Sequence, residues 1–114
     1  MISLKRIEYE IINETKCGEE ELSILIGGFA KEYGLETLLD ALVNLIEQGL
    51  LICTRGTSNK VMKISSKDLE EYVNKRKKSG ENLIEYPEVC KELYFFATDE
   101  GIKYLNDEDQ PISN

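Results

Sequence analysis

Glu36–Arg55 reads ETLLDALVNLIEQGLLICTR, and this stretch decides the fold that we predict for the chain. Apolar residues recur at helical spacing through its first part, which predicts a helix over 36–48. Gly49 is typical of a residue that ends a helix, and the apolar run 50–54 that follows it directly predicts a short β-strand. The solvent side of the predicted helix would carry Glu36, Thr37, Asp40, Ala41, Asn44, Glu47 and Gln48.

Two further helices are predicted before this stretch. Ser3 can cap a helix over 3–15, and a largely apolar segment predicts a second helix over 20–33. Gly27 and Gly28 each lower helix propensity by about 1 kcal/mol, so we expect that another helix approaches closely there. The helix over 36–48 is then the third of the chain.

Beyond the first strand, the pattern predicts a turn over 55–59 and a second short strand over 61–64. The sequence from Ser65 to Asp68 is similar to a capping box, which predicts that a helix begins there and runs over about 67–77. Residues 79–82 break this helix, and 83–92 contain Pro87 and fit no single element.

The last part of the chain returns to a regular pattern. The run 93–97, LYFFA, predicts a strand, and Thr98 can cap a short helix that ends at Leu105. The polar tail 106–114 is expected to fray. No repeat or linker divides the chain, so its 114 residues are expected to form one domain.

Two segments resemble the winged-helix superfamily of winged helix-turn-helix domains. LIEQGLL (45–51) is similar to the junction of the recognition helix and the wing, and YFFATDEGIKYL (94–105) is similar to the wing strand that enters a closing helix through a Thr-x-x-Gly turn. The resemblance implies an α+β fold over roughly 3–105. It would have three helices, a wing with a helix-containing insert at about 56–92, and a short closing helix.

The chain departs from DNA-binding members of this superfamily in two respects. Such proteins usually place Ser, Thr, Arg, Lys, Asn or Gln on the exposed side of the third helix, whereas the corresponding side here carries Glu36, Asp40 and Glu47 and no cation. Their wing is usually a tight hairpin, whereas about 38 residues separate Arg55 from Leu93 here. Both departures argue against sequence readout in the DNA major groove.

Composition limits the classes of protein to which the chain can belong. No apolar run approaches the ~20 residues of a membrane span, and the N-terminal residues lack the layout of a signal peptide, so we expect a cytoplasmic protein without a membrane partner. Cys17, Cys53 and Cys90 are widely spaced and odd in number, which favours reduced thiols. Histidine is absent, so His-based nucleophile activation and Cys/His zinc sites are impossible. We expect no catalytic residue, no metal and no cofactor.

The formal net charge of −8 is unevenly distributed. Residues 1–54 carry a net −6 and residues 79–114 a net −7, whereas residues 55–78 carry a net +5. The basic segment supplies the candidate nucleic-acid ligands Arg55, Lys60, Lys63, Lys75, Arg76, Lys77 and Lys78. The run 75–78 has two other interpretations, because cations stabilise a helix C-terminus and also pair with carboxylates of an acidic body.

An acidic body attracts basic protein partners and repels nucleic acid. The layout is also similar to small acidic bacterial winged-helix proteins, some of which are immunity proteins that neutralise toxins. We therefore expect an immunity-type inhibitor that covers the active surface of a basic toxin, of which a nuclease is one kind. The candidate partner-binding residues are Glu81, Glu85, Tyr86, Glu88, Glu92, Asp99, Glu100, Glu36 and Asp40. The alternative is a winged-helix transcriptional regulator that binds DNA through its wing and basic run, and the oligomeric state stays open.

Overall fold

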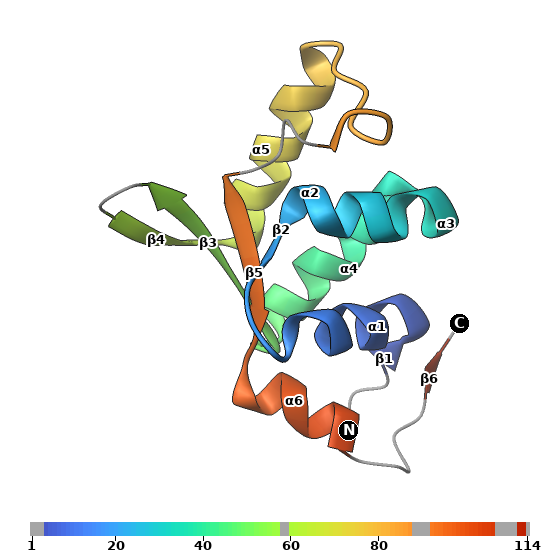
Figure 1. The fold of residues 1–114 in the computed structure, drawn as a ribbon, viewed down its shortest axis with the longest axis vertical. Coiled ribbons are helices and arrows are strands. Elements are labelled where there is room, and N and C mark those ends of the chain that lie inside the picture. Colours follow the sequence, from blue (N-terminus) through green and yellow to red (C-terminus); the bar gives the residue numbers. More distant parts are fainter. Residues whose placement is uncertain (1–3, 58–59, 88–91, 107–111, 114) are drawn as a thin grey trace.

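Helices and a small antiparallel sheet together form an α+β fold in the computed structural model, which describes residues 4–57, 60–87, 92–106 and 112–113 (Figure 1). The elements follow in the order β1 (Leu4–Lys5), α1 (Arg6–Thr15), β2 (Glu20–Glu21), α2 (Leu22–Leu25), the π-helix η1 (Ile26–Ala30), α3 (Lys31–Tyr33), α4 (Leu35–Glu47), β3 (Leu51–Thr57), β4 (Lys60–Ile64), α5 (Ser66–Lys78), β5 (Leu93–Ala97), α6 (Asp99–Asn106) and β6 (Ile112–Ser113).

The main sheet has the strand order β2-β5-β3-β4, with antiparallel neighbours throughout. Cys53 of β3 lies opposite Phe95 of β5 on one side and Ile64 of β4 on the other. Because side chains alternate between the faces of a sheet, this register places Cys53, Phe95 and Leu93 on one face, where all three are buried. That face forms one wall of the core.

Helices α1, α2 and α4 lie beside this sheet, while the hairpin of β3 and β4 projects away from them (Figure 1). The core is filled by apolar residues that the helical periodicity places on one side of each helix, such as Ile11 of α1, Leu25 of α2 and Leu42 and Leu45 of α4. The predicted helices over 36–48 and 67–77 and the predicted strands over 61–64 and 93–97 are each found within two residues of their expected bounds.

The structure corrects the expected start and end of the chain. Leu4 and Lys5 form β1, and α1 begins only at Arg6, so the predicted helix start was wrong; the proposed cap, Ser3, lies outside the described residues. Strand β1 pairs in parallel with Ile112–Ser113, so the expectation of a frayed tail was wrong for this part of 106–114. Leu4 of β1 is itself buried in the core.

The predicted helix over 20–33 is interrupted twice. Glu20–Glu21 forms a strand that pairs with β5, and the helical segment that follows contains a π-helical turn at Ile26–Ala30. A Cβ added at Gly27 or Gly28 would meet nothing within 4 Å, so the expected close approach of another helix was wrong. The pair instead accompanies the wide helical turn on an exposed surface.

The expected turn over 55–59 was also wrong in its first half, because β3 continues to Thr57. Strand β3 pairs with β4 through Cys53–Thr57 and with β5 through Leu51–Arg55, and α5 follows β4. The N-cap of α5 is as predicted, since the Oγ of Ser65 accepts a hydrogen bond from the backbone N–H of Asp68 at 3.2 Å. Leu69 and Val73 are the buried side of α5, which packs against α4.

Candidate functional site

Helix α4 presents an acidic side to solvent. Glu36, Asp40 and Glu47 are exposed, together with the neutral Thr37 and Asn44. No Lys or Arg occurs between Leu35 and Glu47, so this side has no cation of its own. The sequence anticipated these residues but also placed Ala41 and Gln48 among them; Ala41 is buried where α4 meets α1, and Gln48 is half-buried.

A buried carboxylate lies beside this acidic side and was missed from the sequence. Glu8 of α1 is 2% exposed, and its carboxylate accepts hydrogen bonds from the backbone N–H of Lys5 at 2.8 Å and from the Nδ2 of Asn44. The first bond is one half of a capping box at the start of α1. The second joins α1 to α4, so Glu8 orients the acidic helix.

The segment that follows α5 exposes hydrophobic side chains next to acidic ones. Leu83 is buried and anchors the segment, while Ile84 and Tyr86 are 37% and 54% exposed. The turn is held by Asn82, whose Oδ1 accepts a hydrogen bond from the backbone N–H of Glu85 at 3.1 Å and whose Nδ2 donates to the carboxylate of Glu85 at 3.3 Å. The candidate partner ligands Glu85 and Tyr86 therefore both lie on the surface, whereas Glu88 lies outside the described residues.

Cations of the basic segment pair with the acidic residues that were expected to bind a partner. Arg55 lies 2.6 Å from the carboxylate of Glu92, and Lys77 of α5 pairs with Glu36 of α4. Arg76 and Glu81 form a third pair of this kind, so three of the predicted nucleic-acid ligands are engaged with three of the predicted partner ligands. Of the interpretations that the sequence left open for the basic run, internal pairing is the one that these contacts support.

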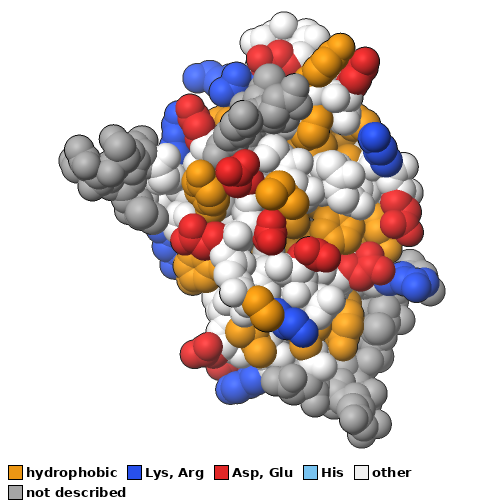
Figure 2. Space-filling model, viewed as in Figure 1, with side chains coloured by type: hydrophobic (Ala, Val, Ile, Leu, Met, Phe, Trp, Pro, Cys, Tyr) orange, Lys and Arg blue, Asp and Glu red, His pale blue; other side chains and the backbone are white. Residues whose placement is uncertain are grey.

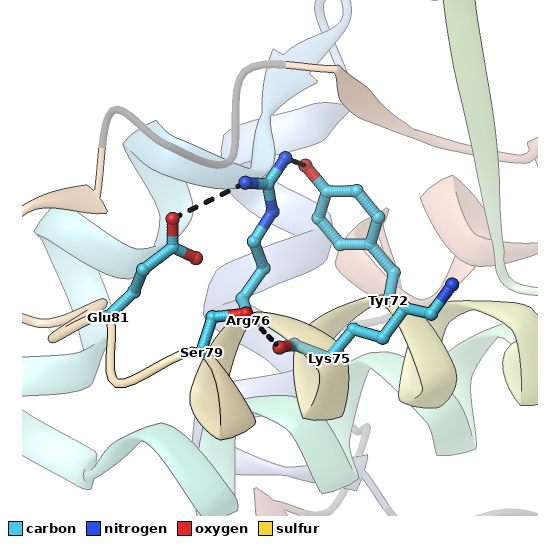
Figure 3. Close-up of polar contacts among 5 residues, drawn as sticks. All are labelled: Tyr72, Lys75, Arg76, Ser79 and Glu81. Atoms are coloured by element: carbon cyan, nitrogen blue, oxygen red, sulfur yellow. Dashed lines mark hydrogen bonds and ion pairs between the residues drawn. The ribbon is translucent and has the colours of Figure 1, made fainter.

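Arg76 makes the most extensive of these internal contacts (Figure 3). Its guanidinium lies 3.5 Å from the carboxylate of Glu81, donates a hydrogen bond to the hydroxyl of Tyr72 at 3.4 Å, and stands 5.2 Å from the centroid of the Tyr72 ring. The Oγ of Ser79 donates to the carbonyl of Lys75 at 3.1 Å and helps to end α5. Arg76 therefore holds the segment after α5 against the helix.

The other candidate cations are divided between β4 and α5. Lys63, Lys75 and Lys78 are exposed and form no ion pair with another described residue, and Lys60 belongs to β4. Lys63 lies opposite Thr54 and Arg55 lies opposite Met62, so the strand alternation directs Lys63 and Arg55 to opposite faces of the sheet. A continuous phosphate-binding track through both residues is therefore not formed.

Asp99 and Glu100 are separated from the predicted partner ligands that follow α5, Glu81, Glu85 and Tyr86. They occupy the first turn of α6, which lies at the lower end of Figure 1, whereas the segment after α5 lies at the upper end. Glu100 pairs with Lys103 at 3.2 Å. Their position at a helix N-terminus stabilises α6 without any partner.

Acidic side chains also cover a surface that the sequence did not single out. Figure 2 shows Asp and Glu side chains in a band across the middle of the molecule, at the level of α2 and α3 in Figure 1, with hydrophobic side chains between them. Acidic residues of α1, β2 and α3 contribute to the charge of the chain's first half.

The described thiols differ in accessibility. Cys17 is exposed, whereas Cys53 is fully buried, and burial raises the pKa of the Cys53 thiol to about 12. A thiol that stays protonated is a poor nucleophile. Cys90 lies outside the described residues.

Among 4–57, 60–87, 92–106 and 112–113, no three Cys, Asp or Glu side chains come together as metal ligands. None of the helices in these ranges combines the length and the apolarity that a bilayer crossing requires.

Comparison with known proteins adds no assignment: no protein-family model, no curated protein and no solved structure matches this chain.

Proposed function

We propose that this chain is a non-catalytic protein-binding module whose partner is a basic protein. The observation that carries the proposal is the exposed side of α4, on which Asp40 and Glu47 stand without a Lys or Arg of the same helix and without an ion pair to another described residue, next to Glu36, which pairs with Lys77. Such a surface repels phosphates and attracts a basic protein, chiefly by accelerating its association. The net charge of −8 acts in the same direction.

The segment after α5 supports the same proposal with a different kind of contact. Interfaces depend on a few large side chains, Tyr prominent among them, that become buried on binding. Tyr86 and Ile84 are exposed beside Glu85 and are held on a turn anchored by the buried Leu83. Ion pairing of Lys77 with Glu36 joins this end of α5 to the first turn of α4. The hydrophobic anchors are therefore linked to the N-terminal turn of the acidic helix, and the rest of α4 runs through the middle of the molecule (Figure 1).

We further propose that the domain is of the winged-helix type. The order of helices before β3, the antiparallel neighbours β2, β5 and β3, and the short α6 after β5 support this interpretation. The insert would comprise β4, α5 and the residues up to Glu92. In this arrangement α4 takes the place of a recognition helix, but its acidic side suits a protein surface rather than DNA.

The specific form that we propose is an immunity-type inhibitor, located in the cytoplasm, that covers the active surface of a basic toxin. A nuclease is one candidate target, because enzymes that bind a polyanion present cations at their active surface. An acidic protein can cover those cations without performing chemistry. No cofactor takes part in this proposal.

The second candidate function is a DNA-binding regulator. The observation that favours it is that Lys63, Lys75 and Lys78 are exposed and form no ion pair with described residues. Duplex binding is strongest at low salt, so an electrophoretic assay at ~50 mM salt tests it under the most favourable conditions. Absence of a shifted complex there would eliminate the regulator.

The proposal is tested by capturing the partner of the tagged full-length chain from the lysate of its own host, with and without nuclease treatment. We expect a stoichiometric basic protein that survives nuclease. The association rate constant of the recovered pair is then measured for the variant Asp40→Lys/Glu47→Lys and for the control Glu14→Lys/Glu70→Lys, which changes the net charge equally with exposed residues of α1 and α5. The α4 variant should associate several-fold more slowly than the control, and equal rates would remove α4 from the interface.

A further inference from the structure

A groove of about 650 Å³ lies between α5 and the sheet. Its size falls within the range of about 300–1,000 Å³ that is typical of ligand-binding sites. The sheet contributes Ile64, Leu93 and Arg55 to its wall. Arg55 and Leu93 are direct neighbours across β3 and β5, so the groove is an outward continuation of the sheet face that forms the core.

The helical wall of the groove is a single stripe along α5. Its residues recur at intervals of three and four positions, which places them on one side of a helix. They are Asp68, Glu71, Tyr72, Lys75, Arg76 and Ser79. Leu69 and Val73 are the buried residues of α5. Helix α5 thus has a buried apolar edge and, next to it, a polar stripe that lines the groove.

The charges of this stripe are segregated along the groove. Asp68 and Glu71 lie in the N-terminal half of α5, and Lys75 and Arg76 lie in its C-terminal half. Complementarity to the helix dipole accounts for Asp68 in the first turn and for cations in the last. It does not account for Glu71, which lies in the middle of α5 and adds a second carboxylate at the acidic end.

Only some of these charges are balanced within the described part of the protein. Arg55 and Arg76 are paired with Glu92 and Glu81. Asp68, Glu71 and Lys75 are exposed and form no ion pair with another described residue. The groove therefore offers two carboxylates towards the N-terminal end of α5, one ammonium group a helical turn beyond Glu71, and the apolar surface of Ile64 and Leu93 alongside.

We propose that this groove binds a short extended segment of the protein partner, which carries a cationic side chain, a hydrophobic residue and then an acidic side chain. The cation would lie between Asp68 and Glu71, the hydrophobic residue against Ile64, and the carboxylate at Lys75. The inference rests on the proposed function, because it assumes a protein partner with basic side chains. Opposite charges at the two ends align the segment along the groove, and a long cationic side chain covers apolar surface with its methylene groups.

Three capped tetrapeptides with the same apolar centre test the proposal by NMR titration of the full-length ¹⁵N-labelled chain. One carries Arg and Asp at its ends, one carries Arg at both ends, and one carries Asp at both ends. We expect the bipolar peptide to bind most tightly, at millimolar concentration or below, and to shift the amide resonances of 68–79, Ile64 and Leu93.

Two charge reversals sharpen the test. Glu71→Lys should weaken the bipolar peptide by at least about threefold, whereas Glu70→Lys, on an exposed position outside the groove, should not. Lys75→Glu should make the peptide with two Arg residues the tightest binder. Its control, Lys78→Glu, should leave the order of the three affinities unchanged. Equal binding of the three peptides, shifts elsewhere on the protein, or no shift at millimolar peptide would each overturn the proposal.

The result of the peptide titration can be distinguished from the result of the partner capture that tests the proposed function. If a basic protein partner were captured but the peptides failed to bind, the groove would be excluded as a binding site, and the proposal of a protein-binding module would stand. Binding of the bipolar peptide in the groove without any captured protein would leave the groove as a peptide site and contradict the proposed function.

Discussion

Gly101 of α6 lies against the backbone of Leu50, and a Cβ at residue 101 would stand 2.3 Å from the Leu50 carbonyl oxygen. The same carbonyl accepts a hydrogen bond from the N–H of Thr98 at 3.1 Å, and the Oγ1 of Thr98 donates to the carbonyl of Gly49 at 2.8 Å. Gly49 has a φ of +76°, which glycine adopts without strain. The exit of α4 is thus locked to the entry of α6, which fixes the direction in which α4 presents its acidic side.

Replacing Gly101 by Ala should destabilise the fold by about 1–3 kcal/mol or more, because the added methyl group collides with rigid backbone rather than with a flexible side chain. Urea denaturation followed by circular dichroism measures the change. The matched control is Gly27→Ala, where a Cβ meets nothing within 4 Å. It should be neutral or gain up to about 1 kcal/mol from helix propensity. A stability for Gly101→Ala equal to that of the unmodified protein would show that α6 does not pack against Leu50 in this way.

The two described thiols should react at different rates. Cys17 is exposed and Cys53 is buried with a pKa raised to about 12, so a thiol reagent at pH 8 should label Cys17 rapidly and Cys53 only as the protein unfolds. Mass spectrometry of digested samples after timed labelling separates the two sites. Rapid labelling of Cys53 in the folded protein would contradict the packing of β3 against β5.

The same burial makes the stability sensitive to alkaline pH. The folded state holds the Cys53 proton up to a pKa of about 12, whereas the unfolded chain releases it near the ordinary value of 9.0. The unfolded state therefore binds fewer protons between these values, and the free energy of unfolding should fall as pH rises from about 9 towards 12. Unfolding curves of the unmodified chain and of Cys53→Ala measure this contribution, since the variant should lose less stability over that interval. If the free energy of unfolding fell equally in the two proteins over this interval, ionisation of Cys53 would be excluded as the cause.

Arg76 and Lys78 are both cations of the basic run but should differ in their effect on stability. Arg76 is partly buried, pairs with Glu81 and stacks near Tyr72, so Arg76→Ala should cost about 1 kcal/mol. Lys78 is exposed and pairs with no described residue, so Lys78→Ala should change stability by less than about 0.5 kcal/mol. Thermal or chemical denaturation of both variants gives the comparison. An effect of Lys78→Ala as large as that of Arg76→Ala would show that the contacts in Figure 3 do not stabilise the fold.

Tyr86→Ala should separate binding from stability. Its side chain is 54% exposed, so its loss should change the free energy of unfolding by less than about 0.5 kcal/mol. If Tyr86 is an anchor of the interface, affinity for the captured partner should fall by about tenfold or more. Isothermal titration calorimetry measures the affinity, and Met62→Ala, another exposed hydrophobic residue that lies on β4, is the control. Equal affinities of the two variants would exclude Tyr86 as an anchor.

Residue patterns with a local physical cause were predictable. The apolar periodicity of 36–48, the β-rich run 93–97, the Ser65 cap and the exposed acidic side of α4 each follow from interactions within a few residues. Two of the errors lie where distant segments meet. The pairing of Leu4 with Ile112 and the strand Glu20–Glu21 against β5 depend on partners far along the chain, whereas the extension of β3 to Thr57 depends on its hairpin with β4.

The features of the candidate site also divide into those that follow from local sequence and those that depend on distant segments. The sequence by itself determined the charge of α4, the absence of histidine and the excess of acidic residues, because these are properties of composition and helical spacing. Only the tertiary structure decided that Lys77 meets Glu36, that Arg55 meets Glu92, that Glu8 is buried beneath α4, and that one polar stripe of α5 lines a groove. Ion pairs and cavities depend on the relative placement of segments tens of residues apart, which is settled by the packing of the whole core and not by any local pattern.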